Sequence, residues 1–168
     1  YFICNFSFSQ VLNNRYGEAF TDRPFFNQEF IKENKLKSLK GSFVYKNKGE
    51  VIKPTRFKYV YQFNKEGNLT SSYETKYHNG IKDTLWNIYL YNQENHLTLH
   101  RKKDYEGYSS IEYTYDDKGR VIDENYMREI DSNYQIVRSL SFNKESIEYF
   151  DSNLQTKSTR YNNYGLPY

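Results

Sequence analysis

The sequence predicts a mainly β fold, an antiparallel meander of consecutive β-hairpins with one short helix near the N-terminus. Three observations lead to this prediction. Apolar residues alternate with polar ones in several stretches, as at Ile111, Tyr113 and Tyr115, which is the period of a half-buried strand. A short turn motif recurs along the chain, and an aromatic residue directly precedes every copy. Aromatic residues make up 19% of the 168 residues, so a tyrosine-rich sheet face can bury area without a thick aliphatic core.

The clearest copy of the motif lies in segment 111–124. Asp116 suits the first position of a type I turn, because its carboxylate can accept hydrogen bonds from the backbone N–H groups that follow. Gly119 suits the closing position, where φ turns positive and a Cβ would clash. Such a turn is common in hairpins with a three-residue loop. The predicted register pairs Tyr115 with Val121 and Tyr113 with Asp123.

The same turn recurs along the chain, at intervals of 18 to 28 residues between closing positions. This spacing is typical of one hairpin plus a connection, and therefore of a repeat architecture. The predicted closing residues are Gly49, Gly67, Asn95, Gly119, Ser146 and Gly165. The aromatic residues that precede the turns are Tyr45, Phe63, Tyr91, Tyr115, Phe142 and Tyr161, and we expect them to line one face of the sheet. Asparagine tolerates the left-handed conformation, whereas serine fits it less well.

The pattern Tyr113-x-Tyr115-Asp116-x-x-Gly119-Arg120-Val121 resembles one copy of the Rhs/YD repeat. The resemblance is clearest at 111–124 and fair at 57–75. Rhs/YD proteins form long sheets of consecutive hairpins, often in large secreted or surface proteins, and some wrap a toxin domain. This chain has few and irregular copies. The resemblance therefore implies a secreted bacterial protein with a handful of YD-like repeats rather than a closed shell.

The chain divides into three predicted parts. Residues 1–9 are uncharged and largely apolar, which is typical of the end of a signal peptide and also fits an ordinary first strand. Residues 10–34 form a lead-in with a short helix near Asn27–Glu33. Residues 35–168 form the hairpin repeat region, which we expect to continue in a longer protein. The single cysteine, Cys4, lies in the signal-like part, so disulfides and thiolate metal sites are not expected in a mature chain.

No set of residues has the spacing of a catalytic or metal site. His96 and His100 would lie about 13 Å apart on one strand face, which is too far for a single metal ion. The net charge of +3 is spread along the chain without a basic run, which argues against nucleic acid as a partner. No glycine-rich phosphate loop is present. We therefore expect no enzyme activity, no cofactor and no membrane span.

The predicted function is that of a non-catalytic repeat protein that is secreted, periplasmic or at the cell surface. It would present an extended β-sheet for binding or scaffolding, with a glycan or peptide at the sheet surface or edge. The alternative is a cytoplasmic MORN-like antitoxin or partner-binding module, although the Gly-x-Trp and Tyr-x-Gly signals of MORN copies are missing here.

Three further expectations concern single features of the sheet. The pattern Asp83-Thr84-Leu85 makes Thr84 a candidate for O-glycosylation. Because Trp86, Ile88 and Leu90 alternate with tyrosines, we expect this strand to be covered on both faces. The last strand, near 154–161, has no evident return strand, so its open edge would allow self-association.

Overall fold

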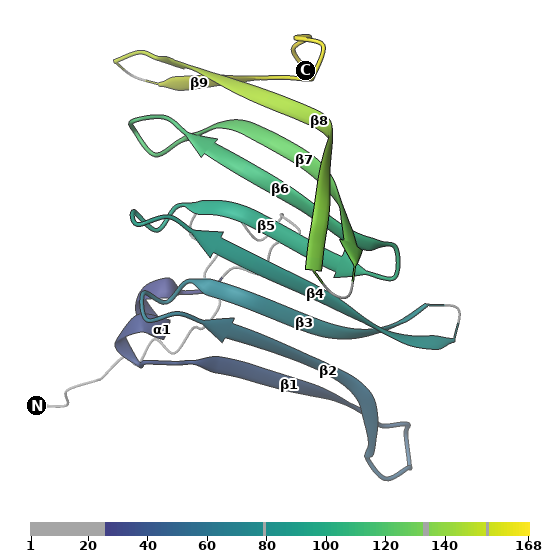
Figure 1. Cartoon of the computed structure of the whole chain (residues 1–168). Coiled ribbons are helices and arrows are strands. Elements are labelled where there is room, and N and C mark those ends of the chain that lie inside the picture. Colours follow the sequence, from purple (N-terminus) through teal and green to yellow (C-terminus); the bar gives the residue numbers. More distant parts are fainter. Residues whose placement is uncertain (1–25, 79, 133–134, 154) are drawn as a thin grey trace, which may run out of the picture.

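The computed structural model describes residues 26–168, except for 79, 133–134 and 154. In this part of the chain one helix precedes nine strands, which form a single antiparallel sheet in chain order (Figure 1). The elements are α1 (Gln28–Glu33), β1 (Ser38–Tyr45), β2 (Lys53–Phe63), β3 (Leu69–His78), β4 (Ile81–Tyr91), β5 (Leu97–Asp104), β6 (Gly107–Tyr115), β7 (Val121–Ser132), β8 (Gln135–Asp151) and β9 (Thr156–Tyr161). The predicted meander with a short helix is therefore confirmed. The predicted signal-peptide remnant at 1–9 lies outside the described residues.

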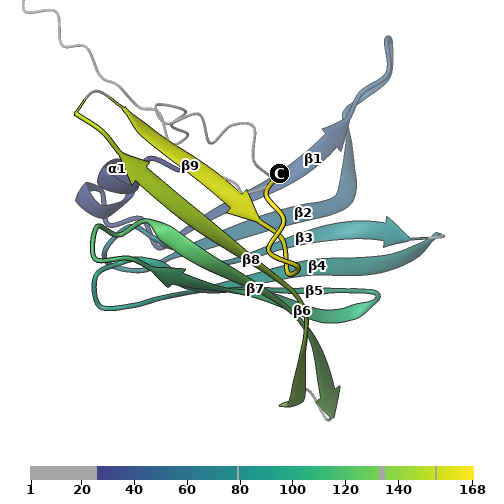
Figure 2. The same cartoon turned by 90° about the horizontal axis from the view of Figure 1, so that it is seen from above.

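The sheet curls along its strand order, so that it has a concave and a convex face (Figure 2). The short helix lies against the concave face, beside the turn between β2 and β3. The side chain of Asn27 caps the helix by accepting a hydrogen bond from Phe30 N–H at 3.0 Å. Six residues are too few for a stable isolated helix, so packing must stabilise it. Ile31 provides that packing, because its side chain is 0% exposed against Phe63, Leu69 and Tyr89.

Four turns share one hydrogen-bonding arrangement, and they begin at Asn64, Asn92, Asp116 and Asn162. In each, the side-chain oxygen of the first residue accepts from the backbone N–H four residues later, at 2.8–3.0 Å. The first carbonyl also accepts from the N–H of the closing residue. The closing residues Gly67, Asn95, Gly119 and Gly165 have φ of 86°, 65°, 74° and 73°. The roles predicted for these asparagine, aspartate and closing residues are confirmed.

A bulge follows three of these turns and changes the register by one residue. Tyr115 pairs with Val121 as predicted, but Tyr113 pairs with Glu124 and not with Asp123. The prediction was wrong because the strand beyond the turn contains one unpaired residue, Ile122. Thr70 and Thr98 hold the matching positions in the other two hairpins. Their hydroxyls donate to Gln62 and Leu90 carbonyls at 3.1 and 3.2 Å.

Two predicted turns need correction. Ser146 does not close a turn, because it lies within β8 and pairs with both Asp123 and Tyr161. The strand continues through this segment because its backbone groups are paired with β7. The turn comes later in the chain, where Ser152 N–H donates to the Gln155 carbonyl at 2.9 Å. Gly49 has the expected positive φ of 83°. The hydrogen bond that closes its turn runs from Glu50 N–H to the Asn47 carbonyl, whereas in the four turns that share one arrangement the donor is the closing residue itself.

The end of the chain partly covers the last strand. After the turn that begins at Asn162, Pro167 forms an antiparallel bridge with Tyr161. The backbone N–H of Tyr168 donates to the Arg160 carbonyl at 3.1 Å. The expectation that β9 has no returning chain beside it was therefore wrong at its C-terminal half. Self-association through this edge stays a prediction.

The β7–β8 hairpin bends toward the convex side of the sheet (Figure 2). Register shifts between Tyr126 and Met127 and between Ile130 and Asp131 accompany the bend. A second buried cluster lies on this side. The Glu129 carboxylate accepts from Arg101 Nε and Nη2 at 2.6 and 2.8 Å and from Ser110 Oγ at 3.0 Å. Both oxygens of the Glu129 carboxylate therefore have partners, which a buried carboxylate requires.

The fourth strand is covered on one face only. Tyr89, on the concave face, is 5% exposed, whereas Trp86 and Leu90, on the convex face, are 46% and 48% exposed. The expectation of cover on both faces was therefore wrong. The alternation of apolar residues correctly predicted a strand, but no second layer of the described chain lies over the convex side of β4.

Candidate functional site

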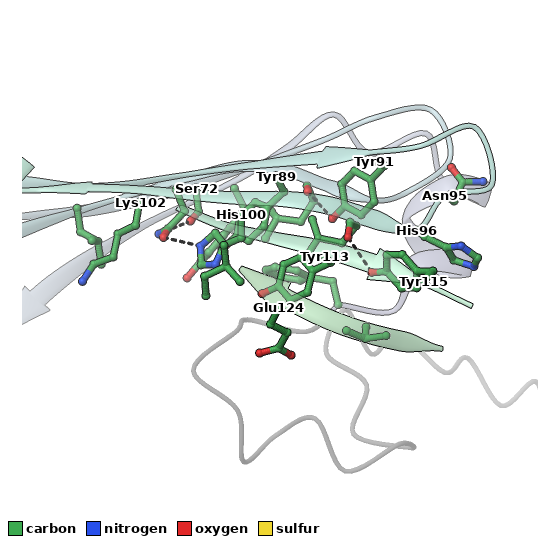
Figure 3. Close-up of a pocket in the computed structure, with 18 of the residues that line it drawn as sticks. Ser72, Tyr89, Tyr91, Asn95, His96, His100, Lys102, Tyr113, Tyr115 and Glu124 are labelled. Atoms are coloured by element: carbon green, nitrogen blue, oxygen red, sulfur yellow. Dashed lines mark hydrogen bonds between the residues drawn. The ribbon is translucent and has the colours of Figure 1, made fainter. Parts of the chain in front are cut away.

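A groove of about 1380 Å³ runs along the concave face of the sheet. Strands from β2 to β9 contribute side chains to it, and tyrosines dominate its lining (Figure 3). The residues that matter for its chemistry are Ser72, Asn87, Tyr89, Tyr91, His100, Lys102, Tyr113, Tyr115, Glu124, Tyr149 and Arg160. Concave sites lined by aromatic side chains with a few oriented polar groups are typical ligand sites.

The floor of the groove carries a row of polar side chains on β3, β4 and β5. The His100 ring stacks on Tyr89, with ring centroids 4.7 Å apart and an interplanar angle of 8°. His100 Nε2 lies 3.0 Å from Asn87 Oδ1, and Asn87 Nδ2 donates to Ser72 Oγ at 3.2 Å. Since an amide oxygen only accepts, His100 Nε2 carries the proton in this contact. The chain of contacts fixes the imidazole orientation within the groove (Figure 3).

Tyrosine hydroxyls at the turn end of the groove connect successive hairpins. Tyr91 donates to the Leu69 carbonyl at 2.7 Å, and Tyr115 donates to the Leu97 carbonyl at 2.7 Å. The same contact links Tyr149 to Val121 at 2.9 Å. Each acceptor is the first residue of the return strand of the preceding hairpin. These hydroxyls therefore hold the hairpins in register, while the rings line the groove.

The far end of the groove is charged. Glu124 and Glu145 face each other on neighbouring strands, a placement that destabilises a sheet unless a cation lies between them. Arg160 on β9 supplies that cation, and its Nη1 lies 3.1 Å from Glu124 Oε2 and 2.7 Å from Glu145 Oε2. The Tyr126 hydroxyl donates to Glu124 Oε2 at 2.7 Å.

The two kinds of acid at this end have opposite pKa shifts. Burial alone would raise the pKa of the Glu145 carboxyl, but hydrogen bonds from Tyr168 and Arg160 lower it overall. Burial, together with the hydrogen bond to Glu124, raises the pKa of the Tyr126 phenol well above its usual value. Glu145 is therefore held as an anion and Tyr126 as a neutral donor.

The predicted aromatic face is confirmed for three of its six members and is wrong for two. Phe63, Tyr91 and Tyr115 lie on the concave face, packed in the core or lining the groove. Phe142 lies at the bulge of β8 and is 63% exposed. Tyr161 shares the convex face with Ser146, since the two residues pair directly, and its hydroxyl donates to Glu148. The sixth member, Tyr45, is exposed near the end of β1.

Sequence reasoning missed Tyr149, which takes the structural place expected for Phe142. Tyr149 lies on the concave face with Ile147, and the alternation in this segment ends at Asp151, just before the real turn. The signal in the sequence that could have identified this turn is the apolar–polar alternation that ends at Asp151. Phe150 lies between Tyr149 and Asp151, whereas all other copies place the aromatic residue directly before the turn, so this copy does not match the motif.

The remaining sequence predictions have the following outcome. Thr84 is exposed on β4, and its glycosylation stays a prediction. His96 stacks on Tyr115 and His100 on Tyr89, so the two imidazoles pack against different tyrosines. Among the described residues, no group of three His, Cys, Asp or Glu side chains is arranged to hold a metal ion. No helix in the described part of the chain has the length and apolar character needed to cross a membrane.

Comparison with known protein families, with characterised proteins and with solved structures found no match to this chain.

Proposed function

We propose that this chain is a non-catalytic binding module of a secreted or cell-envelope protein, and that its concave groove receives an extended glycan or peptide. The observation that carries the proposal is the groove itself, in which tyrosine rings surround a fixed row of polar side chains. Rings offer a large apolar contact at low entropic cost, and fixed polar groups give orientation and specificity.

The state of the polar groups supports binding rather than catalysis. A glycosidase needs one carboxyl with a raised pKa, which acts as the general acid, and a second carboxylate at a defined distance. The pKa of Glu145 is lowered instead, and Arg160 forms ion pairs with both Glu145 and Glu124. His100 is engaged with Asn87 and stacked on Tyr89, which fixes it as a hydrogen-bonding partner.

Glycan arrays and peptide-library pulldowns with the purified chain test this proposal. We expect binding to one ligand class, weakened at least tenfold by Lys102→Glu, which reverses a charge at the groove. Lys65→Glu is the matched control, since it reverses an exposed charge in the turn between β2 and β3. The proposal fails if the folded chain binds neither library above background, or if the two variants weaken binding equally.

A further inference from the structure

A row of aromatic and basic side chains crosses the convex face of the sheet, away from the groove. Val60 pairs with Tyr73, Tyr73 pairs with Trp86, and Trp86 pairs with Lys103 on the successive strands β2 to β5. Directly paired residues project to the same face of an antiparallel sheet, and neighbouring strands lie about 4.8 Å apart. These four side chains therefore form one continuous row.

Trp86 is the chain's single tryptophan, and its position in this row needs an explanation. A side chain of this size usually buries most of its surface, yet Trp86 is 46% exposed in the middle of the sheet. Leu90, two residues along the same face, is 48% exposed. Together they leave an apolar platform on the convex face that the described part of the chain does not cover.

Lysines of β1, β2 and β5 share the convex face with this platform, whereas Glu112 and Glu129 project to the same face on β6 and β7. Lys40 pairs with Val60, and Lys58 lies two residues before Val60 on the same strand, so both belong to the convex face. Both are exposed. The Lys103 ammonium lies 5.0 Å from the centroid of the Tyr108 ring. Lysines therefore lie on both sides of the exposed indole along this face, on β1 and β2 and on β5.

Carboxylates of the same strands lie on the other face. Glu74 lines the groove, and Asp83 alternates with Thr84 and therefore shares the concave side with Leu85 and Asn87. Of the side chains that the structure describes on β1 to β5, no carboxylate projects to the face of Trp86. The convex face of these strands is thus complementary to an anionic ligand.

We propose that this surface, formed by Tyr73, Trp86, Lys40, Lys58 and Lys103, binds an acidic polysaccharide. The apolar face of a pyranose ring can stack on the exposed indole, and uronate or sulfate groups can pair with the lysines. A row of side chains that crosses four strands suits an extended sugar chain. Single-stranded nucleic acid also needs stacking and positive charge, but its proteins combine a basic groove with several successive aromatic platforms. The convex face of the described strands offers one exposed indole.

Affinity electrophoresis tests the proposal with gels that contain alginate, heparin, neutral dextran or oligo(dT). We expect alginate or heparin to retard the chain, and comparing these two polymers distinguishes recognition of carboxylate from recognition of sulfate. We expect dextran to cause no retardation. Trp86→Ala and Lys58→Glu should each weaken the retardation at least tenfold, and Trp86→Phe should weaken it less. The fluorescence of Trp86 should change when the wild-type chain binds the polymer. Salt should weaken binding, because exposed charges are screened.

Lys65→Glu is the control, and it should bind acidic polymers like the wild type. Far-UV circular dichroism of each variant verifies folding, and Lys58→Glu keeps the test decisive if Trp86→Ala is unstable. Equal retardation by dextran and alginate would exclude charge recognition. Stronger retention by oligo(dT) would make this a nucleic-acid surface. Unchanged binding in Trp86→Ala and Lys58→Glu, or no retardation by any polymer, would also overturn the proposal.

Discussion

Gly67 provides a test of how the helix is held on the sheet. This residue has φ of 86°, and a Cβ added to it would lie 2.3 Å from the Gln28 carbonyl oxygen in α1. Gly165 closes a turn of the same type with φ of 73°, and a Cβ there would meet no atom within 4 Å. The two glycines therefore share a backbone requirement and differ in their surroundings, which makes Gly165→Ala the matched control for Gly67→Ala.

Both substitutions force alanine into the left-handed region, which costs about 1–2 kcal/mol. Only Gly67→Ala also clashes with the backbone of the helix, so α1 must move away from the turn. Such a shift puts the burial of Ile31 at risk, and full burial of an isoleucine side chain contributes about 1.5–3 kcal/mol. We therefore expect a loss of about 1–2 kcal/mol for Gly165→Ala and about 3–5 kcal/mol for Gly67→Ala.

Urea unfolding followed by far-UV circular dichroism measures both losses, and hydrogen exchange over residues 27–36 reports on the helix directly. Protection of the helix should fall in Gly67→Ala and stay at the wild-type level in Gly165→Ala. If the two losses in the free energy of unfolding agree within about 0.5 kcal/mol, the usual scatter of neutral surface substitutions, the proposed clash is refuted.

Three further predictions concern the turns and the pH dependence of stability. Asn92→Ala should lose about 1–2 kcal/mol in urea unfolding, because the Oδ1 atom accepts from two backbone N–H groups, whereas Asn92→Asp should lose less. Gly119→Val should destabilise more than Asn95→Gly, which places glycine at a φ of 65°, and the opposite ranking of urea midpoints would refute the turn assignment. The side chain of Lys118 lowers the pKa of Asp151 to about 2. Because this folded-state pKa is lower than the unfolded one, the stabilisation is present above about pH 4 and is lost as the pH falls toward 2. Melting temperatures should fall less steeply over this range in Asp151→Asn than in the wild type, and parallel curves would contradict the assigned role.

Local chemistry made the turns predictable, and long-range pairing made the register unpredictable. Asp116 and Gly119 act within five residues of chain, so their roles follow from side-chain length and the absence of a Cβ. The bulge at Ile122 depends on how two strands pair beyond the turn. Ser146 illustrates the same limit, because its segment has a turn-like composition and yet is held straight by pairing with β7.

The groove depends on information that alternation does not contain. Alternation placed Tyr89 and Trp86 on opposite faces, and the structure agrees. It did not show which face is concave, since curvature arises from bulges and twist accumulated over the whole sheet. The cation between Glu124 and Glu145 comes from Arg160, which is 36 residues from Glu124 along the chain. No local pattern in the sequence connects these residues.

The contacts between successive turns explain how a regular fold arises from irregular repeats. After three of the closing positions, the next residue contacts the following hairpin along the sheet, and the chemistry of the contact differs in each case. Asn68 Nδ2 donates to Asn95 Oδ1 at 3.1 Å, the His96 ring stacks on Tyr115, and Arg120 bonds to Asp151 at 2.8 Å. Each position has to match only its neighbour, as in other repeat proteins whose stability is a sum of nearest-neighbour terms. Substitutions at one contact can therefore be compensated by its single partner, so the repeat can keep its geometry while its sequence diverges from copy to copy.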